Sequence, residues 1–365
     1  MLENNNNVIL KTFTANSGSI MLENYKYKLA NATGLPWLFH YLNRKKPLIL
    51  TYHGLFDGPV HKTGSLPATF VHVDNFAQQM AFIKKKYRVI SPQDILDCVD
   101  GKTDLPVNAA LITFDDGYES FHRLAWPILK SMDISAVVFV PTRYVEDRKP
   151  FWFDIVWLYL KVSSRDEIGW LVDTMDQIQS CSRPLSPLTP FVFTIMKSMA
   201  PEKRDRIMDR IFSELIKKTS PDDPTFRLFY SMTGDIIKEV ARHGVVFGGH
   251  THSHTIMSSM DDDAVKNEIS LNKQALEQIT GHPAEFFAYP NGGQEDFDER
   301  HKHMLRNAGY KVAFSLTYRR SPIFEDTLNV SRINVNPEDT LESFDFHNSG
   351  IVHHYNRLKK LTNHF

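Results

Sequence analysis

The sequence predicts a parallel α/β fold, either a barrel of the triosephosphate-isomerase type or a doubly wound open sheet. Short β-rich runs recur along the chain, and each is followed by a polar turn and a stretch with helical spacing. The runs are almost continuously apolar, which is typical of parallel strands buried on both faces. The 365 residues, 42% of them hydrophobic, fit one large domain or two ordinary ones and exclude a disordered or collagen-like chain.

The expected strands follow one another from residue 48 to residue 335. In chain order, the strand-forming runs are Leu48–Tyr52, Tyr87–Ile90, Ala109–Phe114, Ala136–Val140, Val245–Phe247, Phe286–Tyr289, Val312–Ser315 and Ile333–Val335. Asp74 is the expected cap of one intervening helix, and Asp261–Asp263 lead into another. Gly281 and Gly309 stand where helix-terminating glycines belong.

Residues 153–227 interrupt this alternation. They are rich in helix formers and prolines, and we interpret them as a helical insertion. The chain then divides into an N-terminal extension (1–46), a catalytic domain (47–335) that carries the insertion, and a C-terminal segment (336–365).

The end of the extension carries a second pattern. The apolar and aromatic run Trp37–Leu42 precedes the basic residues Arg44–Lys46. Such a segment is compatible with weak peripheral contact with a membrane surface. Packing of the segment onto the fold is the alternative.

Composition excludes several classes of protein. The 42 basic and 43 acidic side chains leave a net charge of -1, so no positive field is available to gather nucleic acid. Cys98 and Cys181 are too few for a disulfide scaffold or an all-cysteine zinc site. The N-terminus lacks the features of a secretory signal, and no apolar run approaches about 18 residues. We therefore expect a cytoplasmic protein without a transmembrane segment; the sequence makes no prediction of its oligomeric state.

Two adjacent carboxylates, Asp115 and Asp116, follow the strand Ala109–Phe114. Active sites of parallel α/β folds lie at this end of the strands. Adjacent carboxylates repel each other, so a nearby cation would keep both ionised, one as a hard ligand and the other as a base. An Asp-Asp-Gly turn can also be an ordinary loop, and this motif alone does not decide between the two.

A histidine cluster, His250 to His254, follows the expected strand at Val245–Phe247. Imidazole suits zinc and related transition metals, and histidines at i and i+4 share a face if the segment is helical. His250 and His254 are therefore the expected ligand pair, with His252 pointing elsewhere. Asp116 is the expected third ligand of a site built from two histidines and one carboxylate. A surface histidine cluster is the alternative.

Together these motifs resemble those of the NodB-homology polysaccharide deacetylases of carbohydrate esterase family 4. The sequence TFDDGY at Thr113–Tyr118 matches the first motif of that family, and His250–His254 matches the second. Supporting similarity lies at Leu50–His53, Met232–Glu239 and Phe287–Pro290. The resemblance covers about residues 47–155 and 230–335, and it implies a deformed (β/α) barrel of the polysaccharide deacetylase type.

The resemblance implies an enzyme that removes acetyl groups from an N-acetylated sugar in a glycan or glycolipid intermediate. Asp115 would be the general base, and Asp116, His250 and His254 would hold a divalent metal, zinc first, with cobalt, nickel or iron as alternatives. The metal would polarise the acetamide carbonyl and a water molecule, and Asp115 would accept a proton from that water. Acetate and a free amine would result.

The third motif departs from the family. It commonly reads Phe-Arg-Pro-Pro-Tyr-Gly, whereas this chain has Phe287–Gly292, Phe-Ala-Tyr-Pro-Asn-Gly. The arginine that orients the catalytic aspartate in the family is missing at Ala288, and Arg332 is the expected replacement. A structural arginine at a strand edge is the alternative for Arg332. Asn291 replaces the usual tyrosine, and its backbone N–H could serve the oxyanion. Tyr289 could offer an aromatic face to a sugar, with a core position as the alternative. We group Tyr289, Asn291 and Arg332 as expected substrate-binding residues.

The general acid is also unusual. Family members often place a histidine in a late Leu-x-His motif, but His347, His353 and His354 stand in surroundings that do not match it. His53 ends the first expected strand, in the layer of Asp115 if the fold is a barrel, and we expect it in the catalytic site. The alternative is that His53 forms a hydrogen bond to a catalytic or metal-binding side chain without itself taking part in the reaction.

Other functions stay open on the sequence alone. The altered third motif and the missing late histidine favour a degenerate, non-catalytic carbohydrate-binding protein on the same fold. Another metal-dependent amide hydrolase is the nearest enzymatic alternative. A metallo-β-lactamase-like hydrolase fits less well, because the aspartate that its histidine motif requires is absent.

Overall fold

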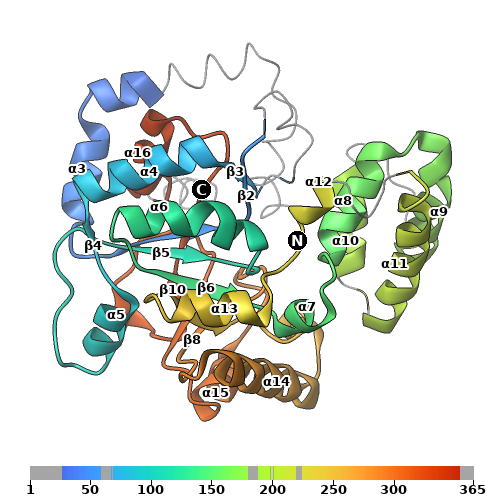
Figure 1. The fold of residues 1–365 in the computed structure, drawn as a ribbon. Helices are drawn as coiled ribbons and strands as arrows, with labels where there is room; N and C mark the ends of the chain where they lie inside the picture. Colours follow the sequence, from blue (N-terminus) through green and yellow to red (C-terminus); the bar gives the residue numbers. More distant parts are fainter. Residues whose placement is uncertain are drawn as a thin grey trace, which may run out of the picture. The chain divides into compact units, whose positions relative to one another are not determined.

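A computed structural model describes residues 27–58, 67, 69–179, 188–197, 199, 201–218 and 224–353 (Figure 1). The chain separates into two compact units. One contains Ala30–Pro150 and Pro224–Phe365 and carries the sheet; the other includes Phe151–Asp223. Cys181, His354 and most of the residues before Lys28 lie outside the described part, while Cys98 is a buried free cysteine.

Parallel pairings join the strands of the central sheet. Its nine strands, within the described residues, are β1 (Leu48–Tyr52), β4 (Arg88–Val89), β5 (Ala109–Phe114), β6 (Ala136–Val140), β7 (Val246–Gly249), β8 (Phe286–Ala288), β9 (Val312–Ser315), β10 (Val330–Ser331) and β11 (Ile333–Asn334). Eight of them follow the order β10-β9-β8-β7-β6-β5-β1-β11, and β4 pairs with β5. A second, two-stranded sheet pairs β2 (Leu55–Phe56) with β3 (Val71–His72).

The two ends of the eight-strand path are neighbours in the chain. β10 pairs with β9, β11 pairs with β1, and only Arg332 separates β10 from β11. The backbone N–H of Arg332 donates to the Ser315 carbonyl at 3.0 Å, and that of Val335 donates to the Thr51 carbonyl at 3.1 Å. The sheet therefore curves into a nearly closed barrel, and the prediction of a (β/α) barrel is confirmed over that of a doubly wound open sheet.

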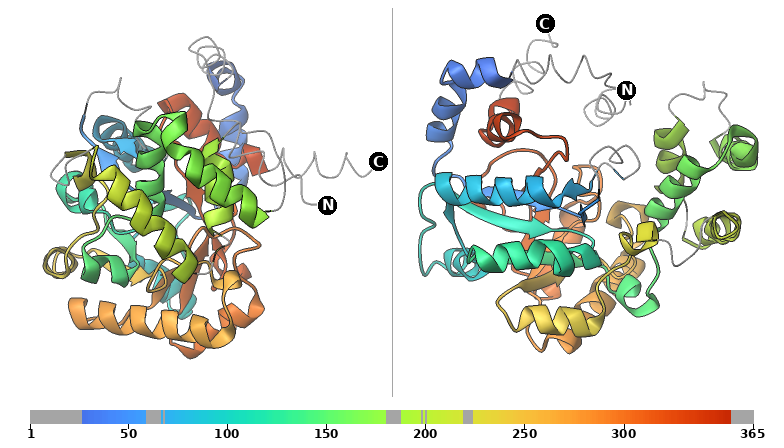
Figure 2. Two further views of the ribbon diagram at one scale, coloured as in Figure 1. Left: turned by 90° about the vertical axis from the view of Figure 1, so that its right-hand side faces the viewer. Right: turned by 45° about the horizontal axis from the view of Figure 1, so that its top comes forward.

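Helices surround the barrel in the same unit (Figures 1 and 2). They are α3 (Leu35–Leu42), α4 (Val73–Lys86), α5 (Pro92–Val99), the π-helical turn Phe121–Ala125, α6 (Trp126–Ser131), α7 (Thr142–Asp147), α12 (Pro224–Arg227), α13 (Gly234–Ala241), α14 (Asp262–Thr280), α15 (Glu299–Asn307) and α16 (Leu341–Asn348), with short 3₁₀ turns at Met257–Ser259 and Ile323–Glu325. Most of them lie in the crossovers between successive parallel strands, where a helix is the usual connection.

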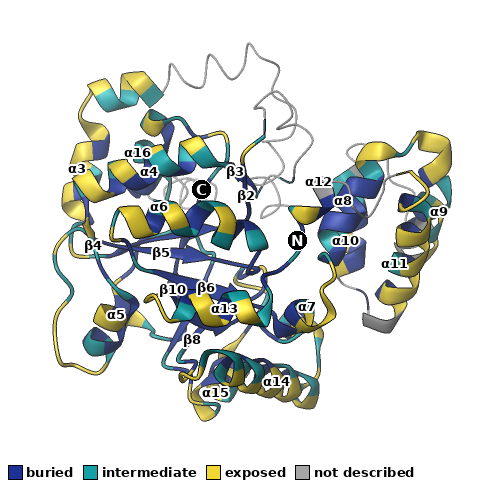
Figure 3. Ribbon diagram, viewed as in Figure 1, coloured by how far each residue is buried: buried dark blue, intermediate teal, exposed yellow. Residues whose placement is uncertain are grey.

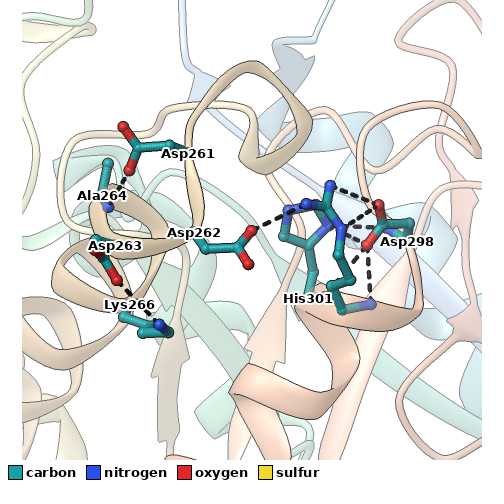
Figure 4. A network of polar contacts seen from close by, with 8 residues as sticks. Asp261, Asp262, Asp263, Ala264, Lys266, Asp298 and His301 are labelled. Atoms are coloured by element: carbon teal, nitrogen blue, oxygen red, sulfur yellow. Dashed lines mark hydrogen bonds and ion pairs between the residues drawn. The ribbon is translucent and has the colours of Figure 1, made fainter.

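Helix ends follow the sequence signals with one correction. The predicted cap Asp74 is wrong, because α4 starts after His72, whose ring accepts a hydrogen bond from the Asp74 backbone N–H. Asp261 caps α14 by accepting from the Ala264 N–H at 2.8 Å, as Figure 4 shows. Gly281 ends α14 with a φ of 72°, a left-handed conformation that glycine adopts without strain.

Strand side chains alternate between two buried layers. The outer layer packs against the helices, and the inner one, which includes Ile49 of β1 and Leu111 of β5, fills the barrel. Because side chains on a strand point inward at every second position, continuing β1 and β5 directs His53 and Asp115 to the inside. The same count along β7 directs His250 inward. The polar residues predicted at the ends of β1, β5 and β7 therefore lie at one end of the barrel.

The second unit is helical. Its described helices are α8 (Trp152–Val162), α9 (Arg165–Gln179), α10 (Leu188–Lys197) and α11 (Pro201–Leu215). They share most of their residues with the insertion expected at 153–227. The boundaries of the extension, the catalytic domain and the C-terminal segment stay predictions.

Helix α3 is unusual because its outward face is the apolar one. Trp37, Tyr41 and Leu42 are at least half exposed, as the yellow colour of α3 in Figure 3 indicates. His40 is buried and contacts the Asp345 carboxylate at 2.8 Å and the Tyr87 hydroxyl at 2.9 Å. Within the described ranges, none of the helices combines the length and the apolarity needed to cross a bilayer.

Candidate metal and catalytic site

An ion pair between Asp115 and Arg332 lies at the end of β5. Arg332 donates from Nη1 to Oδ1 at 2.7 Å and from Nη2 to Oδ2 at 2.8 Å, and Nη1 also donates to the Thr113 hydroxyl at 3.2 Å. Both partners are buried. Burial raises the pKa of Asp115, but the attraction of Arg332 and then His250 outweighs it and leaves the pKa below its usual value. The site therefore holds Asp115 ionised.

Asp116 lies in a tight turn directly after Asp115. Its φ is 70° and that of Gly117 is 64°, and a β-carbon at Gly117 would lie 2.8 Å from a methyl group of Val140. The Asp116 carboxylate is buried. Its Oδ1 has no hydrogen-bond partner among the described residues, and burial raises the pKa of this carboxyl.

His250 is buried and held in one tautomer. Its Nδ1 donates to the Ala288 carbonyl at 2.7 Å, which leaves the lone pair of Nε2 free to accept. That Nε2 lies 3.6 Å from Asp116 Oδ1. Burial lowers the pKa of His250 to about 4, so its ring is neutral near pH 7.

His254 reaches the same carboxylate from a loop. Its Nε2 lies 3.2 Å from Asp116 Oδ1, and its ring centroid lies 4.8 Å from that of His250. The helical spacing assumed from the sequence is wrong, because residues 250–256 form a loop in which Thr251 and His254 have φ values of 54° and 55°. His252 lies elsewhere, with Nδ1 2.9 Å from the Thr142 hydroxyl.

The Asp116, His250 and His254 side chains fit a divalent metal ion. Each offers one ligand atom, and these three atoms lie within 4.8 Å of one another. One carboxylate oxygen and two imidazole nitrogens are a donor set that zinc and related transition metals accept. A cation would also satisfy the buried Asp116 Oδ1 and allow the carboxyl to ionise.

His53 lies beside the ion pair. The register of Tyr52 with Phe114 places His53 next to Asp115 at the strand ends. Its Nδ1 is buried and has no hydrogen-bond partner in the part of the chain that the structure describes. Burial lowers the pKa of His53, and the nearby Asp116 and Asp115 act in the opposite direction.

The three expected substrate-binding residues have different positions. Tyr289 is buried, donates its hydroxyl to the Leu328 carbonyl at 2.8 Å and stacks on Phe297 at 3.7 Å, so it is a core residue and its expected role as a sugar platform is wrong. Arg332 is fully buried against Asp115 and belongs to the interior of the site. Asn291 is exposed, with φ 63°, and its side-chain amide donates to Asp296 at 2.7 Å.

Two residues of α14 that the sequence analysis missed hold the histidine loop. Asn272 accepts from the His250 N–H at 3.2 Å and donates to the Val140 carbonyl at 2.8 Å. Glu268 accepts from the N–H and the hydroxyl of Ser253. The sequence could have indicated Asn272, because it lies in the apolar stripe of its helix. A polar side chain buried in such a stripe needs hydrogen-bond partners.

Comparison with known proteins identifies the family. The polysaccharide deacetylase family model matches residues 102–183 and 187–313, more than half of the chain. Over 58 residues, 16% of this chain, the sequence is 31% identical to the peptidoglycan-N-acetylglucosamine deacetylase of Bacillus cereus. This chain spans only 21% of the length of that curated relative.

Solved structures share the fold at low sequence identity. A Streptococcus pyogenes deacetylase in complex with acetate has a TM-score of 0.54 and 17% identity, covering 82% of this chain and 96% of that one. A de-N-acetylase from Aggregatibacter actinomycetemcomitans has a TM-score of 0.53 and 15% identity, covering 82% and 99%. A Bacillus cereus polysaccharide deacetylase has a TM-score of 0.51 and 16% identity, covering 83% and 69%. With its barrel and its family match, the chain belongs to the polysaccharide deacetylase family.

Proposed function

We propose that the protein is a metal-dependent hydrolase that removes the acetyl group from an N-acetylated sugar in a glycan or glycolipid. The observation that carries this proposal is the position of the buried Asp115–Arg332 ion pair directly beside the cluster of Asp116, His250 and His254. A base and a metal-ligand set are thereby adjacent, an arrangement that suits metal-dependent amide hydrolysis. The family and the fold support the deacetylase chemistry.

Asp115 is the proposed general base. Each of its oxygens accepts one hydrogen bond from Arg332, and a carboxylate oxygen retains a second lone pair that can accept a proton from water. Arg332 fixes the plane of the carboxylate and keeps it ionised. Thr113 in turn fixes the guanidinium from the adjacent inward position of β5.

Asp116, His250 and His254 are the proposed metal ligands. A bound divalent ion, zinc first and cobalt, nickel or iron as alternatives, would supply Lewis-acid polarisation of the amide carbonyl and of water. The Ala288 carbonyl keeps the Nε2 of His250 available as a ligand atom. Asp116 is held in its left-handed turn by the close packing of Gly117 on Val140.

His53 is proposed as a further catalytic-site residue. It follows β1 next to Asp115, and its buried Nδ1 has no hydrogen-bond partner among the described residues. Asn291 stays a predicted substrate contact through its backbone N–H. A cytoplasmic location and peripheral membrane contact through α3 also stay predictions.

Metal content and acetate release test the proposal together. Purified protein is loaded with zinc, freed of excess metal, analysed for bound metal and incubated with a panel of N-acetylated glycans, including peptidoglycan fragments that contain N-acetylglucosamine. We expect about one equivalent of metal and acetate release from at least one glycan. Stoichiometric metal without acetate would favour the non-catalytic carbohydrate-binding alternative, and no bound metal would contradict the proposal.

A further inference from the structure

We propose that Glu268 of α14 is a positioning residue that holds His254 in its metal-binding orientation. This inference rests on the metal site of the proposed function, and it assigns a role to a residue outside the ligand set. The Glu268 carboxylate accepts from the backbone N–H of Ser253 at 2.7 Å and from its hydroxyl at 2.8 Å. Ser253 immediately precedes His254, so the Glu268 carboxylate fixes the backbone one residue before the proposed metal ligand His254.

The loop at residues 250–256 needs hydrogen bonds of this kind because the backbone of His254 is in the left-handed conformation. Residues with a β-carbon avoid this conformation and retain it only where their surroundings enforce it. The hydroxyls of Ser253 and Thr255 lie 2.7 Å apart on either side of His254, and the Thr255 N–H donates to the Thr251 hydroxyl at 3.1 Å. Glu268 connects the His254 end of this hydrogen-bonded loop to a regular helix.

His250 has a separate set of supports. Its ring donates to Ala288, and its backbone N–H donates to Asn272. Asn272 and Glu268 are four residues apart on α14 and therefore lie on one face of the helix. One helix thus supports both ligand histidines, and the hydrogen bonds of Glu268 go to Ser253, on the His254 side of the loop. Its loss should release His254 and leave His250 in place.

A matched control exists on the same helix. The Glu277 carboxylate also accepts from a backbone N–H, that of Ala284 at 3.0 Å, and it pairs with Lys273 at 3.0 Å. Glu277→Gln makes the same chemical change as Glu268→Gln, but in a carboxylate whose hydrogen bonds do not involve the histidine loop. A general loosening of α14 would affect both variants, whereas a positioning role affects Glu268 alone.

The test measures metal affinity in the full chain. Metal-free wild type, Glu268→Gln, Glu268→Ala and Glu277→Gln are titrated with zinc against a chromogenic chelator, and the cobalt-loaded forms are compared by visible absorption. Thermal unfolding of the metal-free proteins identifies any variant that fails to fold. We expect Glu268→Ala to bind zinc about 10- to 100-fold more weakly, with a changed cobalt spectrum. Glu268→Gln keeps only one acceptor and should show a smaller loss, while Glu277→Gln should match wild type.

The outcomes separate this inference from the proposed function. If wild type binds zinc and both Glu268 variants bind it within twofold of wild type, the positioning role is wrong and the metal site stands. Equal weakening by Glu277→Gln would also overturn the positioning role, because the effect would then belong to the helix in general. If wild type binds no zinc, the proposed function itself fails.

Discussion

Replacing Arg332 with methionine removes the cation that faces the proposed base. Both side chains of the Asp115–Arg332 pair are buried, and two short hydrogen bonds join them. Breaking a buried ion pair by removing one partner costs about 3–5 kcal/mol, because the remaining charge stays uncompensated. At roughly 2–4 °C per kcal/mol, the melting temperature of the metal-free protein should fall by about 6–20 °C.

The same variant should shift the pH dependence of acetate release. Burial alone raises the pKa of Asp115, and Arg332 is the first of the groups that lower it. Without Arg332 the pKa should rise, so protonation of the base should begin at a higher pH than in wild type. In Arg332→Met, the acidic limb of the pH profile should therefore shift to higher pH.

A double variant separates the ion pair from general packing. Asp115→Asn with Arg332→Met removes both charges, so it should recover a large part of the stability lost in the single Arg332→Met variant while remaining inactive. Urea and thermal unfolding of the metal-free proteins measure the stabilities. A loss below about 1 kcal/mol in Arg332→Met, or a double variant less stable than that single variant, would refute the reasoning.

Three further outcomes are expected. Metal analysis should find that His254→Ala loses bound metal and His252→Ala retains it, and equal loss from both would contradict the ligand assignment. Burial is the largest influence on the pKa of Asp345 and raises it, but the hydrogen bonds and charges of His40 and Lys86 together outweigh burial and lower the pKa. This carboxylate therefore stabilises the fold above its unfolded pKa of about 3.9. In unfolding assays Asp345→Asn should therefore be less stable at neutral pH, with a difference that shrinks as the pH falls below about 3.9; a pH-independent difference would count against this. If α3 contacts anionic lipid, vesicle co-sedimentation should decrease in Trp37→Glu, and unchanged sedimentation would exclude this contact.

Strands with long apolar runs were predictable from the sequence. β1, β5, β6 and β9 have the expected bounds, because runs of three to six consecutive apolar or β-branched residues favour buried strands in an α/β chain. β10 was not predicted, since it contains only Val330 and Ser331. The closure of the barrel depends on that strand, so it could not be derived from the run Ile333–Val335 alone.

The candidate site was predictable in its residue types more than in its geometry. Two adjacent carboxylates and three alternating histidines reveal donor groups, but positive φ values at Thr251 and His254 have no signal in those residue types. The histidines therefore converge through a loop rather than a helical turn. For Tyr289 the residue type was itself ambiguous, because a tyrosine at a strand end can contact a sugar or belong to the core. Its stacking on Phe297, seen only in the structure, distinguishes the two positions.

The most direct test of the central claim compares zinc-loaded wild type with Asp115→Asn on a glycan that releases acetate. Asp115 is the proposed base and lies outside the ligand set of Asp116, His250 and His254. We predict that the variant keeps the full equivalent of zinc and releases no measurable acetate above the uncatalysed rate. Acetate release near the wild-type rate by the metal-loaded variant would show that Asp115 is not the base, and loss of zinc would show that the two aspartates have been assigned in the wrong order.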